Sequence, residues 1–105
     1  MEKLWLKNID PKIPQEIDAD SHPSVWAMAQ EAITTYGDKD AFSNFGAKIS
    51  FNDIDCLSQN LAAYLQNDLG LKRGDRIAIM CTNILSFLIT LSANLRSGLV
   101  RVNVN

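Results

Sequence analysis

The sequence has few of the residues from which disulfide scaffolds and metal centres are built. Its 105 residues include two cysteines and one histidine. Cys56 and Cys81 form no CxxC pair, and no histidine is spaced from them as a zinc ligand would be, which argues against a zinc site, a thioredoxin motif or a disulfide framework. We therefore expect two unpaired thiols in a reducing compartment, with the burial of Cys81 more certain than that of Cys56.

Glycine is also scarce where a phosphate-binding loop would need it. Such a loop lies at a strand-to-helix turn, because backbone N–H groups must approach the anion without a Cβ in the way. The turn of this kind that we expect, residues 80–83, contains no glycine, so a Rossmann or Walker site lacks its physical basis. Three acidic pairs lack the glycine and terminal glutamate of an EF-hand loop and are expected at solvated turns and caps. They are Asp18/Asp20, Asp38/Asp40 and Asp53/Asp55.

Neither sign of charge dominates the chain. Ten basic and twelve acidic residues give a net charge of −2, and the basic residues are scattered, so we expect no nucleic-acid partner. Lys72, Arg73 and Arg76 could meet an anion, but Asp75 interrupts them, which favours a solvated turn. His22 is expected at the surface, because a lone histidine has no catalytic partner. We name no catalytic, cofactor-binding or metal-binding residue.

No hydrophobic run is long enough to cross a membrane. The longest apolar stretch, residues 84–95, contains four polar residues and falls short of the roughly 20 residues that span a bilayer. It is predicted to be a buried helix. The N-terminus lacks the apolar core of a signal peptide. We therefore expect a cytoplasmic protein without a transmembrane segment.

What the sequence does contain is typical of an ordered soluble domain, with 47% hydrophobic and 21% charged residues. Residues 1–20 show no sustained helical or strand pattern and include Pro11 and Pro14, which predicts an extended arm anchored by Trp5. Residues 21–105 are expected to form one α/β unit.

The α/β unit is predicted to begin with a helix over about residues 24–36. Ser21 or Ser24 can cap its start, and Gly37 can turn left-handed at its end. Helical spacing places six residues on one apolar stripe. They are Val25, Met28, Ala29, Ala32, Ile33 and Tyr36. Two short strands, residues 41–45 and 48–51, then flank a Gly-Ala pair and predict a hairpin.

A second helix follows the hairpin. Ser50 with Asp53 resembles a capping box, and Gly70 ends the helix. Its amphipathic stripe consists of Ile54, Leu57, Leu61, Ala62, Leu65 and Leu69.

The second half of the chain predicts a parallel β-α-β unit. A buried strand over residues 76–80 leads to a helix that Asn83 caps and that ends near Ser97 and Gly98. Residues 99–104 form the next strand, and strand–helix–strand succession predicts parallel strands. The chain stops directly after this strand, so we expect it to be one part of a longer protein.

Several strings resemble the start of adenylate-forming enzymes, and most closely the bacterial long-chain fatty-acid CoA ligases. The resemblance covers essentially the whole chain. The strings are Trp5-Leu6, Asp40-Ala41-Phe42, Ser50-Phe51 with Asp53-Ile54, residues 61–66, residues 69–78, Asn83, Arg96-Ser97-Gly98 and residues 102–105. The most specific are Gly70 to Ala78 and the closing Val-Asn-Val-Asn.

This resemblance implies a fold and an activity for the longer protein. The chain would be the N-terminal portion of the large domain, a hairpin and a parallel β-α-β unit flanked by helices. The full enzyme would join a fatty acid to coenzyme A in two steps, with ATP and Mg²⁺, through an acyl-adenylate. The residues that bind ATP, Mg²⁺ and coenzyme A would lie beyond Asn105, so the chain alone would be an inactive scaffold without a cofactor.

The resemblance also implies partners. These are the remainder of the enzyme, a second copy contacted through the arm, and the inner membrane at its periphery. Two positions depart from the pattern. Cys81-Thr82 stands where a proline often precedes Asn83, and Arg101 stands where an aliphatic residue is usual. We therefore expect the Arg101 side chain at a sheet edge or beside a carboxylate, because an unpaired buried charge is costly.

Two other interpretations of the sequence stay open. Another adenylate-forming enzyme, acting on short-chain, aryl or amino acids, would share the same N-terminal sequence, because the substrate pocket lies elsewhere. A non-catalytic interaction or dimerisation module would use the arm to bind a partner.

Overall fold

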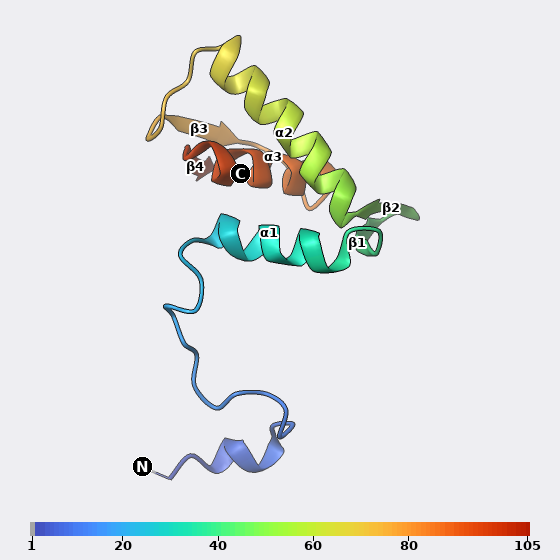
Figure 1. Ribbon diagram of the computed structural model, residues 1–105, viewed down its shortest axis with the longest axis vertical. Helices are drawn as coiled ribbons and strands as arrows, with labels where there is room; N and C mark the ends of the chain where they lie inside the picture. The colour runs from blue at the N-terminus through green and yellow to red at the C-terminus, as the bar shows by residue number, and fades with distance from the viewer. Residues whose placement is uncertain (1) are drawn as a thin grey trace.

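Three helices and four short strands follow a loosely attached N-terminal arm in the computed structural model, which describes residues 2–105 (Figure 1). The arm contains a five-residue 3-10 helix. In chain order the elements are η1 (Leu4–Asn8), α1 (Val25–Tyr36), β1 (Asp40–Asn44), β2 (Ala47–Ser50), α2 (Phe51–Asn67), β3 (Arg76–Ile79), α3 (Leu85–Ser97) and β4 (Val100–Asn103). The α/β fold class predicted from the sequence is confirmed.

β1 and β2 form the predicted antiparallel hairpin. Its two-residue turn places Phe45 at φ 48° and Gly46 at φ 80°, and two successive positive φ values are typical of the type I′ turn that suits twisted strands. Lys48 on β2 pairs with Asp40 on β1, and this hydrogen bond, with the attraction of the carboxylate, raises the pKa of the Lys48 ammonium. The pair is solvent-exposed and adds little to stability.

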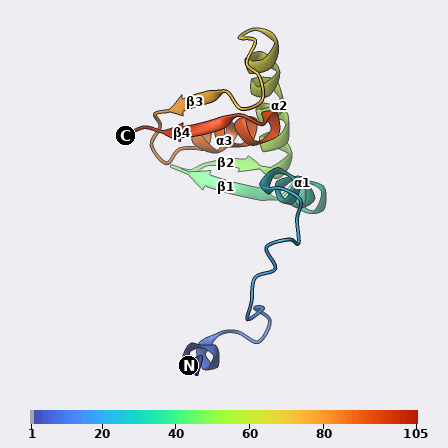
Figure 2. The same ribbon diagram turned by 90° about the vertical axis from the view of Figure 1, so that its left-hand side faces the viewer.

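β3 and β4 are parallel, as the strand–helix–strand pattern predicts. Ile77 is in register with Arg101, and Ile79 with Asn103. α3 connects the strands and lies behind them in the view of Figure 2. Arg101 is exposed on β4, an edge strand of this two-stranded sheet, and its guanidinium lies 5.4 Å from the Phe87 ring centre. A cation–π contact with α3 therefore takes the place of a carboxylate partner.

The core is centred between α2 and α3, which pack against each other more extensively than any other pair of elements. The buried apolar residues come from these helices and the strands beside them. They are Ile49, Ile54, Ala62, Leu65, Ile79, Ala93 and Leu99. The predicted stripe of α2 is partly wrong, because Leu57 and Leu69 are exposed and Ser58 is buried in their place. Ser58 is small enough to let α3 approach closely.

α1 is attached to this core less firmly than its predicted stripe suggests. Val25, Met28 and Tyr36 are exposed, whereas Trp26 and Ile33 are half-buried. The prediction of an inward-facing Met28 is therefore wrong. The inward face is rotated toward Trp26 because its ring packs under a guanidinium on α3.

The helix caps agree with the sequence at three positions. Ser24 accepts a hydrogen bond from the Ala27 N–H at 3.0 Å, and Ser50 forms a complete capping box with Asp53. Gly98 at the end of α3 has φ 68°, in the left-handed region. α2 ends at Asn67, with the left-handed Gly70 a few residues further on.

Two predicted caps are wrong. Gly37 has φ −19° and is not left-handed. A Cβ at Gly37 would lie 2.8 Å from Asn52 Oδ1, so any larger residue there would have to displace the Asn52 amide. Asn83 does not cap α3, because the N-cap residue is Ile84 and makes no side-chain hydrogen bond. The Asn83 carbonyl instead accepts a hydrogen bond from Asn44 Nδ2 at 3.1 Å, which ties the start of α3 to β1.

The arm differs from the predicted extended segment in one respect, because η1 contains a 3-10 turn around Trp5. The sequence pattern gave no sign of it, since a 3-10 helix this short needs no apolar periodicity. The prediction that Cys81 is more certainly buried than Cys56 is also wrong, because both thiols are exposed. No helix within residues 2–105 is long and apolar enough to cross a bilayer.

Candidate functional site

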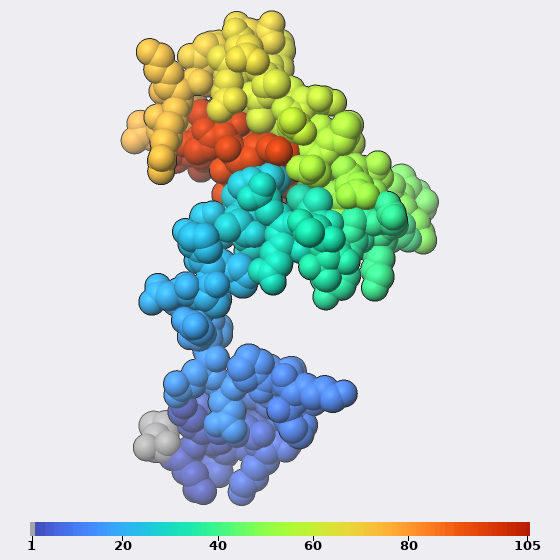
Figure 3. Space-filling view, in the orientation of Figure 1, coloured from blue at the N-terminus to red at the C-terminus, as the bar shows by residue number. Residues whose placement is uncertain are grey.

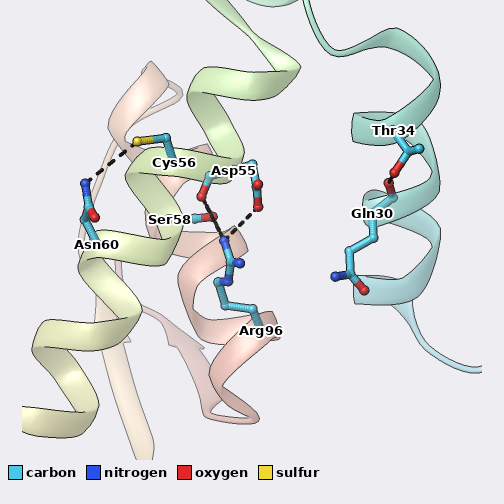
Figure 4. Close-up of polar contacts among 7 residues, drawn as sticks. All are labelled: Gln30, Thr34, Asp55, Cys56, Ser58, Asn60 and Arg96. Atoms are coloured by element: carbon cyan, nitrogen blue, oxygen red, sulfur yellow. Dashed lines mark hydrogen bonds and ion pairs between the residues drawn. The ribbon is translucent and has the colours of Figure 1, made fainter.

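A polar cluster joins α2 and α3 around Arg96 (Figure 4). Arg96, in the last turn of α3, directs its Nη1 at α2. This atom donates hydrogen bonds to the Asp55 carbonyl at 2.8 Å, to Asp55 Oδ1 at 3.0 Å and to Ser58 Oγ at 2.9 Å. The same guanidinium lies 4.6 Å from the Trp26 ring centre on α1. One side chain therefore joins three helices.

The environment of this junction is structural and not catalytic. The Arg96 side chain is 17% exposed, the Asp55 side chain 41% exposed, and Ser58 is fully buried. The Ser58 hydroxyl donates to the Asp55 carbonyl at 3.2 Å and accepts from Arg96, so it has no base that could take its proton. No sequence pattern predicts this pair, because Asp55 and Arg96 are far apart along the chain.

His22 is half-exposed, and its ring connects the short segment before α1 to α1 itself. Its Nε2 lies 2.8 Å from Glu31 Oε2, and its Nδ1 lies 3.0 Å from Ser21 Oγ. Ser21, His22 and Glu31 are therefore connected in the same order as the serine, histidine and acid of a catalytic triad. The Glu31 side chain is 69% exposed, whereas the acid of a catalytic triad is buried. The His22 contacts therefore hold the segment that precedes α1 against that helix.

Lys72, Arg73 and Arg76 lie in and beside the turn that precedes β3. Asp75 Oδ2 accepts a hydrogen bond from the Lys72 N–H at 2.7 Å and closes this turn. The stem of Arg73 packs beside Gly98, where an added Cβ would lie 3.0 Å from Arg73 Cγ. The Asp75 carboxylate therefore lies within this turn, and the side chain of Arg73 packs against the chain at Gly98.

The acidic pairs are divided among separate local contacts. Asp18 accepts from the Asp20 N–H, Asp38 from Asn52 and Asp53 from Ser50. Within residues 2–105, no three His, Cys, Asp or Glu side chains are grouped closely enough to hold a metal ion.

A shallow groove of about 300 Å³ lies between β1 and the start of α3. Its lining is mostly apolar and contains Phe42, Ile84 and Phe87, with the amides Asn44 and Asn83 at its polar side. No charged residue lines it. The turn from β3 to α3, residues 80–84, has no glycine and no side-chain cap. These residues do not fit ATP or Mg²⁺, and we derive no chemical step from them.

The described residues form an α/β segment with an antiparallel hairpin, three helices and a parallel strand pair. Residues 29–105 match the family described as AMP-binding enzyme. Because this span is most of the chain, the protein belongs to the AMP-binding enzyme family.

Relatives with assigned names agree with this membership. Over 105 residues the chain is 44% identical to a long-chain-fatty-acid–CoA ligase of Yersinia pestis and 41% identical to one of Salmonella typhimurium. A third, from Bacillus subtilis, is 32% identical over 104 residues. These alignments cover 99–100% of the chain but only 18–19% of each relative.

Solved structures show the same fold. The N-terminal subdomain of NpsA from Klebsiella oxytoca superposes with a TM-score of 0.73 at 29% identity, over 78% of this chain and 21% of that one. A putative long-chain-fatty-acid CoA ligase from Rhodopseudomonas palustris gives a TM-score of 0.73 at 23% identity, over 83% of this chain and 22% of that one.

Proposed function

We propose that this chain is the N-terminal part of an ATP-dependent long-chain fatty-acid–CoA ligase. The overall reaction would convert a fatty acid, ATP and coenzyme A into acyl-CoA, AMP and pyrophosphate. One observation carries the proposal: seven relatives, each named long-chain-fatty-acid–CoA ligase, are 32–44% identical to it over nearly the whole chain. Because the chain spans about 19% of the first of these relatives, the activity would belong to the larger protein.

The role of the chain within that enzyme would be that of a scaffold. Its most constrained polar contact, at Arg96, fixes the three helices against one another and leaves no group available for chemistry. We place the groups that bind ATP, Mg²⁺ and coenzyme A outside these residues. The parallel pair β3–β4 supports this role, since parallel sheets occur in proteins where both faces are covered.

We further place the enzyme in the cytoplasm, with the inner membrane as a peripheral contact. The reason is chemical, because a long-chain fatty acid partitions into lipid and would be collected there. A second copy contacted through the arm is the other partner that the sequence led us to expect. It stays a prediction.

The alternative that the sequence left open is another adenylate-forming enzyme, acting on short-chain, aryl or amino acids. The likeness to NpsA at 29% identity concerns the shared fold and does not favour this alternative. Sequence identity favours the fatty-acid reading, with up to 44% against 29%.

Pyrophosphate release by the full-length protein separates the two readings. With ATP, Mg²⁺ and coenzyme A present, we expect release that depends on a long-chain acid such as palmitate and that is much weaker with benzoate or amino acids. Release that depends on an aryl or amino acid and not on a long-chain acid would favour the alternative adenylate-forming enzyme. No release with any acid would favour the interaction module.

The isolated 105-residue chain provides the matched control. We expect it to release no pyrophosphate and to show no heat of Mg-ATP binding by calorimetry. The sequence contains no glycine loop, and residues 2–105 contain no metal-binding carboxylate cluster. Turnover by this chain, or micromolar ATP binding, would show that it contains a site.

A further inference from the structure

Phe45 lies in the turn of the β1–β2 hairpin with its whole side chain in solvent. It is 100% exposed, the highest value among the large apolar residues that the structure describes. Figure 3 shows the hairpin, in green, at the rim of the α/β body. Burial of an aromatic ring is strongly favourable, but no contact within residues 2–105 removes this ring from water.

The backbone of Phe45 is as unusual as its exposure. Phe45 is the one non-glycine residue in the described part of the chain that has a positive φ, at 48°. It occupies the first turn position of a type I′ hairpin, where asparagine, aspartate and glycine are preferred because they tolerate this conformation. A bulky residue there is an outlier. Since phenylalanine suits neither this turn nor the core beside it, a requirement outside the folding of these residues accounts for it.

An apolar surface continues from Phe45 toward the body. The groove of about 300 Å³ is lined by β1 up to Asn44, the residue before Phe45. Phe42 on one side of the groove is 45% exposed, and Ile84 on the other side is 37% exposed. The hydrogen bond from Asn44 to the Asn83 carbonyl holds the two sides together. The hairpin thus presents an aromatic ring beside a shallow apolar groove, an arrangement suited to a packed interface.

The position of this surface favours a later part of the same chain as its partner. Figure 2 shows the hairpin turn, the ends of β3 and β4 and the C-terminal residue on one side of the body. The bond from Asn44 to Asn83, and another from the Val104 N–H to the Ile79 carbonyl, tie these parts together. The chain spans only 19% of the first curated relative. In the longer protein of the proposed function, the residues that follow Asn105 therefore start beside the hairpin turn.

We propose that Phe45 anchors the hairpin to the part of the longer protein that follows Asn105, which encloses the ring and covers the neighbouring groove. The inference rests on the proposed function, because it requires the chain to be one segment of a longer enzyme. Size also favours this partner over a second copy. A specific interface between separate proteins buries about 800 Å² on each side, whereas a covalently joined segment is already at a high effective concentration and needs less contact.

Site-specific cross-linking in the full-length protein tests the contact directly. With the photoreactive p-benzoylphenylalanine in place of Phe45, irradiation should join this position to residues beyond Asn105 of the same polypeptide, which mass spectrometry of the digest identifies. The same protein irradiated in urea is the matched control and should lose this cross-link. A cross-linked dimer would overturn the proposal in favour of a second copy. The absence of any cross-link beyond Asn105 would overturn it in favour of a solvent-exposed ring.

Two substitutions in the full-length protein provide a test that depends on the sign of the effect. Phe45→Asn introduces the Asn-Gly pair that type I′ turns prefer, so it would raise the thermal midpoint if the ring were in water. Because the enclosed ring loses its apolar contacts, we expect the midpoint to fall by about 2 °C or more. Phe45→Leu should have a higher midpoint than Phe45→Asn, since leucine keeps an apolar side chain although it suits the turn less well.

The opposite results count against the anchor. A smaller fall, no change or a rise in the midpoint of Phe45→Asn would contradict it, and so would equal midpoints in Phe45→Asn and Phe45→Leu. Neither measurement needs catalysis. A protein that shows the cross-link and the lower midpoint but releases no pyrophosphate would keep the anchor and lose the proposed function, and release without the cross-link would do the reverse.

Discussion

Arg96 on α3 bonds Asp55 on α2 twice through a single nitrogen, at the backbone carbonyl 2.8 Å away and at the carboxylate Oδ1 3.0 Å away. The contact thus fixes both the position of the α2 backbone and the orientation of its side chain. Because the same guanidinium also covers the Trp26 ring, the angles between three helices depend on one residue.

Replacing Arg96 with methionine should lower the free energy of unfolding by about 2 kcal/mol. The substitution keeps an apolar stem of similar length but leaves the Asp55 carboxylate and the buried Ser58 hydroxyl without their donor. The loss is smaller than the roughly 3 to 5 kcal/mol of a fully buried ion pair, because water reaches the partly exposed Asp55 side chain. Urea melts of the two proteins measure the difference.

Arg101→Met is the control for this prediction. Arg101 also lies over an aromatic ring, that of Phe87 at 5.4 Å, but it is exposed and has no carboxylate partner among residues 2–105. Its replacement should change stability by no more than about 0.5 kcal/mol. Equal losses in the two variants would show that the Asp55 contact contributes nothing beyond a cation–π contact.

Gly98→Val should destabilise the chain by at least about 1 kcal/mol, because Gly98 has φ 68° and a branched residue is strained in the left-handed region. A side chain there would also press on Arg73, whose Cγ would lie 3.0 Å from the new Cβ. Denaturant melts of Gly98→Ala and Gly70→Ala separate these two causes. Gly70 has φ 67° and open space around it, so the excess loss at Gly98 measures the Arg73 contact. A neutral Gly98→Val would contradict the cap.

Local signals in the sequence predicted most of the elements correctly. Ser24, the Ser50–Asp53 box and Gly98 marked helix ends because the caps lie within a few residues of the groups they satisfy. The hairpin and the parallel β-α-β unit followed from short apolar runs and their connections. These features depend on neighbours along the chain, which the sequence displays.

The errors occurred where a distant residue decides the outcome. Asn83 is a good capping residue, yet its carbonyl is held by Asn44 and α3 begins later. Met28 fits a helical stripe, but the packing of Trp26 under Arg96 rotates α1. The Arg96 junction was missed for the same reason, because no local pattern pairs residues from different helices.

Asp53 makes the stability of α2 depend on pH. Hydrogen bonds from the Ser50 N–H and hydroxyl hold the pKa of the Asp53 carboxyl below its usual value of 3.8. A lowered folded-state pKa means that the stabilisation is fully present above the unfolded value and is lost as pH falls through the folded one. Thermal midpoints from pH 6 to pH 2 should therefore fall further for the parent chain than for Asp53→Asn.

Asp18→Asn provides the comparison, since the Asp18 carboxylate also accepts a backbone N–H but lies in the arm, outside any helix cap. It should retain the acid-dependent loss of the parent chain. If Asp53→Asn and the parent chain showed parallel midpoints across this range, the capping box would not be linked to protonation.

Asn94 on α3 is a polar residue at a buried position. Its side chain is 1% exposed, and neither Nδ2 nor Oδ1 has a hydrogen-bond partner among the described residues. A buried amide left unpaired costs about 1 to 3 kcal/mol, and leucine has a similar volume with no polar atom. Asn94→Leu should therefore raise the free energy of unfolding by about 1 kcal/mol, less than the full cost because the branched methyl groups must fit a cavity shaped for a flat amide.

Asn60→Leu is the matched substitution at an exposed position of α2, where the same change should stay within about 0.5 kcal/mol of zero. Urea melts of both variants measure the difference, and a loss of stability in Asn94→Leu beside a neutral Asn60→Leu would show that the amide is satisfied. The sign of the stability change in Asn94→Leu bears on function as well as on folding. Natural proteins retain unsatisfied polar groups mainly where a second requirement overrides stability. A stabilised Asn94→Leu variant whose full-length enzyme releases pyrophosphate more slowly would identify such a requirement on α3, whereas an unchanged rate would mark Asn94 as a stability cost alone.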